Sequence, residues 1–313
     1  MSPELRRFVL RRLGGGLLAV VGAALLVFFV RHLVPGDPVD VLSGGEAADP
    51  RDKEQVRRCL DLDKPLGGQL KAFARDVGSG SLGHSCVSPN PTVASMIARA
   101  FPRTLELAVA ALGLALLFAL PLGVGAALRQ GSLLDGAASA IALAGLSMPM
   151  MWLGPLLIFL FYVRLGWLPG PAAEPGQPGA LFLPAATLAT HLMAMLQRMT
   201  RSSMLEVVGE DYVRTARAKG LPARLVIFKH ALRNALIPVI TVAGIQFGAL
   251  LAGAIITEKI FARPGLGTLM LDAITTRDWK VVQGVVIVIA ISYVIINLLV
   301  DLAYGLADPR IRK

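Results

Sequence analysis

The sequence predicts an all-α protein that crosses a membrane several times. Of its 313 residues, 55% are hydrophobic and 17% are charged, whereas soluble domains average about 25% charged residues. Six stretches of 18 to 28 residues contain no Asp, Glu, Lys or Arg, and a helix needs roughly 20 apolar residues to cross the hydrocarbon core. No stretch alternates apolar and polar residues, and the six are too long for barrel strands. The predicted fold class is therefore an all-α polytopic membrane protein with six transmembrane helices.

The six expected spans follow one another along the chain, and the fourth is the least apolar. They cover residues 13–30, 107–128, 136–163, 175–197, 234–257 and 281–300. The fourth begins with a Pro- and Gly-rich stretch and contains His191, so we place its apolar part at 181–197. Four arginines precede the first span, as in a signal peptide, but the run is long and no small-residue cleavage site follows it. We therefore expect the first span to stay uncleaved.

Basic residues predict how these spans are oriented. With the N-terminus inside, the inner segments hold 16 Lys and Arg residues, and the short outer loops hold 5. Because cytoplasmic loops are the ones enriched in Lys and Arg, both termini are expected in the cytoplasm. The net charge of +10 then reports topology rather than a nucleic-acid patch. Three parts result: the N-terminus and first span (1–34), an outer loop subdomain (35–103), and a core (104–313) with a cytoplasmic loop at about 200–235.

The segment 210–238, EDYVRTARAKGLPARLVIFKHALRNALIP, is basic although it lies between two apolar spans. Small and apolar residues recur in it at roughly helical spacing, namely Ala216, Ala218, Leu221, Leu225, Phe228 and Leu232. Gly220-Leu221-Pro222 is expected to end one short helix and begin another. The pattern predicts a compact helix–turn–helix lying along the membrane. An amphipathic helix that binds anionic lipid is the alternative interpretation.

Five stretches together resemble one family of membrane proteins. DYVRTARAKGLP followed by HALRNALIP resembles the cytoplasmic loop of ABC importer permeases of the dipeptide, oligopeptide and nickel branch, in its B-type component. Four further stretches resemble parts of that branch in the same order along the chain: LDLDKPL with GSGSLGHS, PRTLELA, EKIFARPGLGTLMLDAITTRDWKVVQG and DPRIR. The general importer pattern, Glu-Ala-Ala and then Gly, is matched only at Ala216 and Gly220, as in the peptide branch. Lys280 stands where the branch is expected to carry proline.

The resemblance implies the type I ABC importer permease fold and a multi-pass place in a bacterial cytoplasmic (inner) membrane. In that family the loop forms a coupling helix, which docks on an ATPase subunit and passes ATP-driven movement to the spans. The residues expected to make this contact are Asp211, Tyr212, Arg214, Thr215, Ala216, Arg217, Ala218, Lys219, Gly220 and Leu221. The implied partners are a second permease, two ABC ATPase subunits, an outer solute-binding protein and membrane lipid, with no nucleic acid. ATP and magnesium would be bound by the ATPase subunits, and no cofactor by this chain.

The transported solute implied by the resemblance is a di- or oligopeptide. Nickel chelates, glutathione and oligosaccharides are carried by close relatives and stay open as alternatives. The chain has no Gly-x-x-x-x-Gly-Lys-Ser/Thr, so it is expected to be a transport subunit without an ATPase site. A membrane-embedded hydrolase is a distant alternative, but neither Gly-x-Ser-x-Gly nor His-Glu-x-x-His occurs. A passive channel would leave the cytoplasmic loop without a use.

The outer loop is longer than a simple connection requires. Its stretch DPRDKEQVRRCLDLDKPL predicts a short amphipathic helix, with Val56, Leu60 and Leu62 on the apolar side. Cys59 and Cys86 are the only two cysteines, and both lie in this loop. An oxidising compartment favours a disulfide, worth about 3–4 kcal/mol, over two free thiols. We expect the loop to form a lid over the outer pore mouth, where a binding protein docks.

Other motifs in the chain have a structural interpretation. GSGSLG fits Gly-x-Gly-x-x-Gly but follows no predicted strand, so it is expected to be a turn. The four histidines are scattered, which predicts no metal site. Gly244, Gly248 and Ala252 lie four apart and predict close helix packing, or, in a sharper hypothesis, contact with the second permease across the pore. Polar residues in or beside spans either tie helices together or face a wet path: Glu106, His191, Gln246, Asn297 and Asp301.

Overall fold

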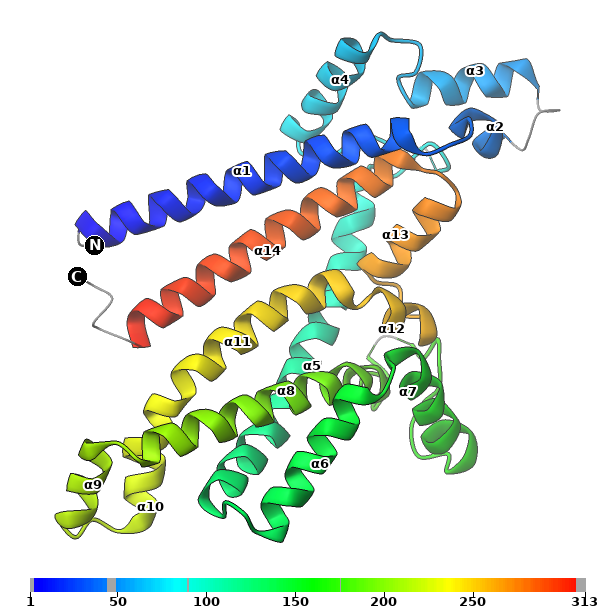
Figure 1. Ribbon diagram of the computed structural model, residues 1–313. Helices are drawn as coiled ribbons and strands as arrows, with labels where there is room; N and C mark the ends of the chain where they lie inside the picture. The colour runs from blue at the N-terminus through cyan, green and yellow to red at the C-terminus, as the bar shows by residue number, and fades with distance from the viewer. Residues whose placement is uncertain (1–2, 44–48, 89, 175, 308–313) are drawn as a thin grey trace.

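The protein is built from five long helices and a set of short ones (Figure 1). The computed structural model describes residues 3–43, 49–88, 90–174 and 176–307, and in these residues it holds no strand, only an isolated bridge between His84 and Thr92. The long helices are α1 (Pro3–Leu33), α5 (Val93–Leu128), α8 (Phe182–Val208), α11 (Leu232–Gly253) and α14 (Trp279–Ala307). The short elements are α2 (Pro38–Ser43), α3 (Pro50–Cys59), α4 (Leu66–Gly78), α6 (Leu133–Ser147), α7 (Met150–Leu157), η1 (Ile158–Arg164), α9 (Asp211–Ala218), α10 (Ala223–Leu225), η2 (Val226–Ala231), α12 (Ile255–Ile260) and α13 (Leu266–Thr275). The predicted all-α class is confirmed. The DPRIR motif lies outside the described residues.

Four of the described helical stretches are long and apolar enough to cross a membrane. They are Leu10–Leu33, Val93–Leu128, Ala223–Leu251 and Trp279–Leu302, and the bent pair Leu133–Ser147 with Met150–Arg164 can count as a fifth. The fourth expected span corresponds to α8, which is 27 residues long and carries Arg198 and Arg201 toward its end. The multi-pass architecture is thus confirmed by length and composition, while the count of six stays a prediction.

The third expected span, 136–163, is not one unbroken helix. α6 ends at Ser147, and the helical stretch that begins at Met150 runs at 104° to it. Met148 has an extended backbone (φ −78°, ψ 122°), because the residue before a proline is pushed out of the helical region. Pro149 also lacks the N–H that would continue the helix. The third expected span is therefore bent, and this stretch is either a broken span or a re-entrant loop.

The core is densest where α5 packs along α8. α5 buries a row of small residues at helical spacing, namely Ala108, Ala111, Ala115 and Ala119. Toward its end, a Cβ on Gly123 would lie 2.6 Å from the Cβ of Thr200 and 2.8 Å from the backbone oxygen of Gln197. Glycine is required there because any side chain would push α5 and α8 apart.

α1 packs mainly on α14, and the two run side by side in opposite directions (Figure 1). Close to the start of α1 and the end of α14, Arg12 pairs with Asp301 at 3.0 Å. The α9–α10 loop lies toward this end of the molecule, whereas α2, α3 and α4 lie at the other (Figure 1). The cytoplasmic loop and the outer subdomain expected from the sequence are therefore at opposite ends of the helices.

The expected amphipathic segment of the outer subdomain is present. α3 ends at Cys59, and Leu60, which follows it, is 1% exposed. Val56 and Leu62 pack on the same cluster of buried side chains, which includes Val27 of α1 and Val281 of α14. The apolar side predicted from the sequence thus attaches the subdomain to the ends of α1 and α14.

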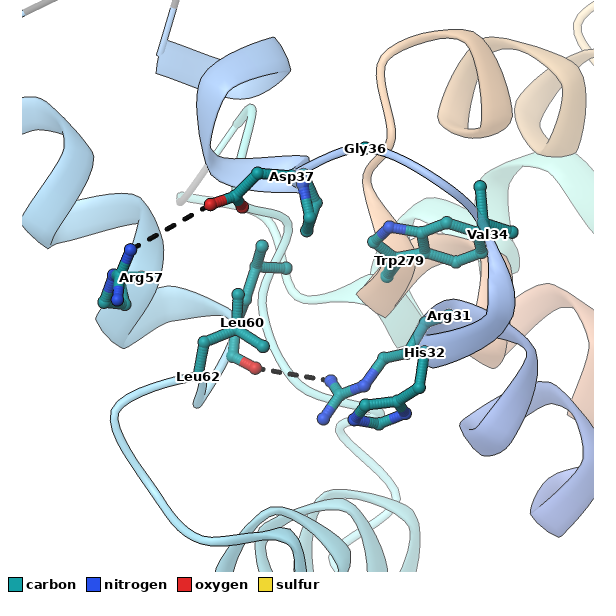
Figure 2. Close-up of a pocket in the computed structure, with 10 residues that line it drawn as sticks. Arg31, His32, Val34, Gly36, Asp37, Arg57, Leu60, Leu62 and Trp279 are labelled. Carbon is teal, nitrogen blue, oxygen red and sulfur yellow. Dashed lines mark hydrogen bonds and ion pairs between the residues drawn. The ribbon is translucent and has the colours of Figure 1, made fainter. Parts of the chain in front are cut away.

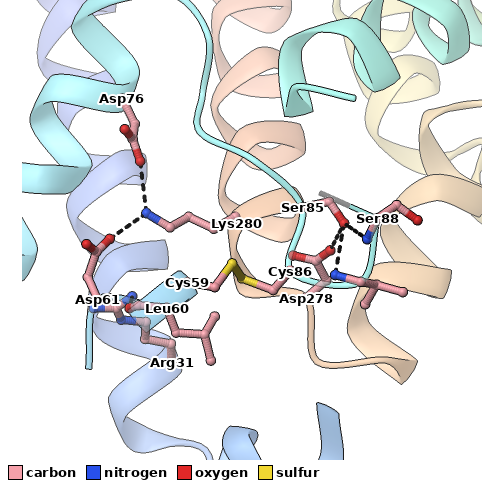
Figure 3. Close-up of a disulfide and its surroundings, with 11 residues drawn as sticks. Arg31, Cys59, Leu60, Asp61, Asp76, Ser85, Cys86, Ser88, Asp278 and Lys280 are labelled. Atoms are coloured by element: carbon pink, nitrogen blue, oxygen red, sulfur yellow. Dashed lines mark hydrogen bonds and ion pairs between the residues drawn. A yellow bond between two sulfur atoms is a disulfide. The ribbon is translucent and has the colours of Figure 1, made fainter. Parts of the chain in front are cut away.

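Polar links also fasten the outer subdomain to α14 (Figure 3). Cys59 and Cys86 form a disulfide with their Cα atoms 5.9 Å apart. Lys280, near the start of α14, places its Nζ 2.7 Å from Asp61 and 2.8 Å from Asp76. Lys280 therefore holds the subdomain to α14 at Asp61 and Asp76, while the disulfide links two positions within the subdomain.

The subdomain boundary that the sequence placed at residue 103 falls inside a helix. Thr92 caps α5, its Oγ1 accepting a hydrogen bond from Ser95 N at 3.2 Å. The helix therefore begins at Val93 and continues through Pro102. The start of α5 packs with the subdomain, since Val93, Ile97 and Ala100 share a buried cluster with Leu60, and the stretch 93–103 is helix rather than loop.

Candidate functional site

α9 is a two-turn helix whose ends are set by the local sequence. It begins after Glu210, which has an extended backbone, and carries Asp211 in its first turn. It ends at Ala218, and Gly220, two residues further on, has a φ of +74°, a left-handed conformation that glycine adopts at no steric cost. The N–H of Gly220 donates to the oxygen of Arg217 at 2.9 Å, and Pro222 then starts α10. The predicted turn at Gly220 is present.

One face of α9 is buried against its own chain. Val213 is 0% exposed and Ala216 is 7% exposed. Both belong to a cluster with residues of α5, α8, η2 and α11, namely Val124, Ala127, Met204, Val226, Ala231 and Ala235. Asn234 Nδ2 also donates to Tyr212 Oη at 2.7 Å, which joins α9 to α11. A force on α9 would therefore act directly on the ends of three long helices.

The opposite face of α9 is open. The exposed residues are Asp211, Tyr212, Arg214, Thr215, Arg217, Ala218, Lys219 and Gly220, with Leu221 half-buried at the turn. Arg214 pairs with Asp211 at 3.7 Å, and both side chains are largely solvated. Of the ten residues expected to meet an ATPase, only Ala216 is buried in the chain itself.

The single apolar face expected for the segment is divided in two. Ala216 is buried, but Leu225 is 38% exposed and Phe228 is 57% exposed. Val213 is the main buried residue of α9, and its place three residues before Ala216 was the sequence signal for it. Helical spacing therefore identified the helix but not which apolar residues turn inward.

The second helix of the predicted helix–turn–helix is not separate. α10, η2 and α11 follow without a break, so Ala223–Leu251 is one continuous stretch long enough to span a membrane. The expectation of a second helix lying along the membrane was wrong, because nothing between Pro222 and Leu232 interrupts the helical ladder. A movement of α9 would therefore reach α11 through the turn at Gly220 as well as through the Tyr212–Asn234 hydrogen bond and the shared buried cluster.

A second ion pair lies in the loop region next to α8. Arg201 of α8 donates through Nε and Nη2 to the two oxygens of Asp135, at 2.6 and 2.8 Å. Asp135 also accepts from the N–H of Gly131 at 3.0 Å. This bidentate contact fixes the start of α6 to α8, seven residues before α8 ends at Val208.

The small-residue stripe of α11 packs within the chain. A Cβ on Gly244 would lie 2.1 Å from Val300, and one on Gly248 would lie 2.8 Å from Tyr293, both of α14. The packing interpretation fits these two glycines, and contact with a second permease across the pore stays a prediction. Nothing is described for the side chain of Ala252. Gln246 and Asn297 are half-buried on α11 and α14.

The sequence analysis also missed a buried carboxylate near the other end of α11. Glu258 is 0% exposed and accepts from Thr104 Oγ1 at 2.6 Å and from the N–H of Gly267 at 2.8 Å. Burial raises the pKa of Glu258, against these hydrogen bonds, which favour the charged form. The Glu258 carboxylate thus links α12, on which it lies, to α5 through Thr104 and to the start of α13 through Gly267. A Cβ on Gly265 or Gly267 would collide with the Glu258 side chain. In the sequence, the two glycines of the PGLG motif were the available signal for this close contact.

Family models match most of the chain. The binding-protein-dependent transport system inner membrane component matches residues 119–313, and the N-terminal model of such membrane components matches residues 5–108. Curated relatives match over almost their full length. The di/tripeptide transport system permease protein of Pseudomonas aeruginosa is 45% identical over 331 residues, covering 97% of this chain and 98% of the relative. The dipeptide permease of Escherichia coli K12 is 43% identical over 335 residues and 98% of each chain.

Other similar proteins widen the comparison. The glutathione transport system permease protein of Pectobacterium atrosepticum is 42% identical over 305 residues, covering 97% of this chain and 98% of the relative. Among solved structures, an inward-facing form of the MetNI methionine ABC transporter matches with a TM-score of 0.58 at 20% identity, covering 68% of this chain and 96% of that one. A second form of it gives a TM-score of 0.54 at 18% identity, with the same coverage. These structures support the fold.

Proposed function

The chain belongs to the family of binding-protein-dependent transport system inner membrane components, as an ABC importer permease of the dipeptide branch, and we propose that it forms half of a translocation pathway for di- and oligopeptides. It is a transport subunit and not an enzyme, because ATP is hydrolysed by a separate subunit of such transporters. It works in a complex with ATPase and binding-protein partners. Beyond this family membership, we propose which solute is carried, which surface contacts the ATPase and how the subunits are arranged.

The observation that carries the proposed coupling is the two-sided character of α9. Val213 and Ala216 attach it to the ends of α5, α8 and α11, while its other face is solvated and mixed in character. Arg217 and Lys219 supply charge, and Tyr212 with the nearby Phe228 supplies exposed apolar surface. A rigid lever needs such an internal attachment and such an external contact. We assign the external contact to the ATPase subunit.

The proposed complex has one further permease, two ATPase subunits and one binding protein. The two permeases would enclose the pathway between them, and ATP with magnesium would be bound by the ATPase subunits alone. Both termini and α9 would lie in the cytoplasm, since the arginines and lysines gather at that end. The outer subdomain, 35–103, would lie at the outer pore mouth as the surface that receives the binding protein.

The proposed solute rests on the relatives. The matched proteins are named for dipeptide, di/tripeptide and glutathione transport, and all three solutes share a peptide backbone with a free carboxylate. Selection among them would reside largely in the binding protein. A peptide is therefore the solute that we propose for this chain, in preference to a nickel chelate or an oligosaccharide.

The test is uptake into proteoliposomes that contain the chain, its partner permease and its ATPase subunits. With ATP inside and the binding protein outside, a labelled dipeptide should accumulate, and omission of either ATP or the binding protein should abolish accumulation. Labelled glutathione, a nickel chelate and an oligosaccharide are assayed in parallel. Accumulation of the chelate or the oligosaccharide without any peptide would refute the peptide assignment, and uptake without ATP would indicate a channel.

A further inference from the structure

A cavity of about 340 Å³ lies where the outer subdomain meets the ends of two apolar helices (Figure 2). Arg31 and His32 come from the last turn of α1, and Trp279 is the first residue of α14. Asp37 and Arg57 line it from the outer subdomain. Because α1 and α14 are both apolar enough to span the membrane and both end here, the cavity lies at the membrane surface.

The guanidinium of Arg31 lies in this cavity without a carboxylate partner. Its Nη1 donates to the backbone oxygen of Leu60 at 3.3 Å, and its Nη2 donates to Gln69 Oε1. Its Nε is buried and has no hydrogen-bond partner. Within the described residues, Arg31 forms no ion pair within 4.0 Å. A half-buried cation of this kind costs free energy unless an anion reaches it.

The nearby acidic groups are already engaged. Asp61 directs its two oxygens to Lys64 and Lys280, at 2.6 and 2.7 Å. Asp37 accepts from the N–H of Val39 at 2.9 Å as the cap of α2, and lies 4.0 Å from Arg57. Asp61 also attracts Arg31 electrostatically, but its two oxygens are hydrogen-bonded to lysines, and Asp37 faces Arg57.

A third arginine adds positive charge at the rim. A Cβ on Gly36 would lie 2.9 Å from Nη1 of Arg277, so that guanidinium rests against the Gly36 turn, which lines the cavity. Two arginines, Arg31 and Arg57, therefore line a space that holds one carboxylate, and Arg277 lies against the Gly36 turn beside them. The cavity is complementary to an anion, and Trp279 with Val34 and Leu62 gives it an apolar wall.

We propose that this cavity binds the phosphodiester headgroup of an anionic phospholipid from the outer leaflet. Guanidinium groups are suited to phosphate oxygens, because their paired N–H groups match that geometry. The place fits as well, since Trp and Arg side chains at the ends of spans lie at headgroup level. The acyl chains would run down the lipid-exposed side of α1, where Leu25, Leu26 and Phe29 are exposed. The lipid would brace α1 against the outer subdomain.

The test uses the full-length protein in micelles that contain phosphatidylglycerol or phosphatidylcholine, with bound lipid counted by native mass spectrometry. One phosphatidylglycerol per chain should be retained well above phosphatidylcholine. The double variant Arg57→Gln, Arg277→Gln should lower that retention, by about fivefold for each arginine removed. The matched control is Arg51→Gln, Arg58→Gln, which removes the same charge from exposed arginines of α3 that do not line the cavity. It should retain the lipid as the parent protein does.

Three results would overturn the proposal. Equal retention in the two double variants would place the lipid elsewhere. Release of phosphatidylglycerol by excess inorganic phosphate would show that the cavity takes a phosphate from solution. Loss of binding-protein affinity in the Arg57→Gln, Arg277→Gln variant, in discs of phosphatidylcholine alone, would show that an acidic side chain of that protein is the occupant.

Discussion

Lys280 Nζ lies 2.7 Å from a carboxylate oxygen of Asp61, although the two residues are 219 positions apart in the chain. The Lys280 side chain is 8% exposed and that of Asp61 13% exposed. Asp76 approaches the same nitrogen at 2.8 Å. Asp61 has a φ of 58°, a conformation uncommon outside glycine, so the surrounding contacts hold it in place. One buried cation thus joins α14 to the α3–α4 loop and to helix α4 of the outer subdomain.

Replacing Lys280 by methionine should destabilise the protein strongly. Asp61, which is 13% exposed, would keep only the more exposed Lys64, and Asp76 would keep no ion pair among the described residues. Breaking a buried pair in this way costs about 3–5 kcal/mol. The matched control is Lys259→Met, since Lys259 pairs with Asp272 at 3.1 Å but is 60% exposed; it should change stability by less than about 1 kcal/mol. Thermal unfolding in detergent measures both. The triple variant with Asp61→Asn and Asp76→Asn should recover part of the loss, and no recovery would contradict the charge explanation.

The same contact predicts a pH dependence of the outer subdomain. Burial alone would raise the pKa of Asp61, but the hydrogen bonds from Lys280 and Lys64 outweigh it and hold that pKa below its ordinary value. A depressed pKa in the folded state stabilises the fold above the unfolded value of about 3.9, and this contribution is lost as pH falls through the folded pKa. Protease resistance of residues 50–80 should therefore be flat from neutral pH to about pH 5 and fall below about pH 4.

In the Lys280→Met variant, Asp61 loses the larger of its two stabilising hydrogen bonds. Its carboxyl should then protonate at a higher pH, so the fall in protease resistance should move upward. Identical pH profiles for the variant and the parent protein would show that another group controls acid sensitivity.

The sequence predicted the helices better than it predicted the contacts between them. α1, α5 and α14 each contain about 20 or more apolar residues in a row, and such a run has few alternatives to a membrane helix. The bend after Ser147 was not predicted, because hydropathy reports how apolar a stretch is and not whether its helix axis changes direction. Pro149 was the sequence feature that indicated a break. The partners of Lys280 lie 204 and 219 residues away, and no local pattern connects them.

The candidate site was predictable to the level of the helix and its turn. Gly220 followed by Pro222 fixed the end of α9, because few residues other than glycine tolerate a φ of +74°. Periodicity could not distinguish Val213, buried in its own chain, from Phe228, which is exposed. Both are apolar residues on helices, and only packing against α5 and α8 separates them.

Coupling through α9 should depend on the shape of the turn at Gly220. Gly220→Val places a β-branched side chain at positive φ, which should distort the turn and move Arg217 and Lys219 away from the ATPase. Gly166→Val is the matched control, since Gly166 has a φ of +64°, open space around its Cβ position and a place just after η1. Uptake in proteoliposomes should fall about tenfold or more in the first variant and little in the second, with both complexes assembled. Equal losses in the two variants would indicate a general effect of strain rather than a coupling site.

The packing of α5 on α8 should depend on Gly123. Gly123→Ala would place a methyl group 2.6 Å from the Cβ of Thr200 and 2.8 Å from a backbone oxygen, and overpacking of this kind costs about 1–3 kcal/mol. Gly113→Ala is the control on the same helix, because no atom lies within 4 Å of its Cβ position. It should be neutral or stabilising, by up to about 1 kcal/mol. Thermal unfolding that ranks the variants the other way would refute the proposed close contact.

The proposed orientation can be tested by labelling single cysteines with a membrane-impermeant maleimide in intact cells. The background variant carries Cys59→Ser and Cys86→Ser, which removes both native cysteines. Lys71→Cys on α4 and Arg224→Cys on α10 then place one exposed thiol at each end of the molecule. Because basic residues gather at the α9–α10 end, Lys71→Cys should react from outside and Arg224→Cys only after permeabilisation. A transport assay on each variant confirms that the complex still folds. The opposite labelling pattern would place α9 outside the cell, beyond reach of a cytoplasmic ATPase, and would remove the coupling assignment together with the orientation.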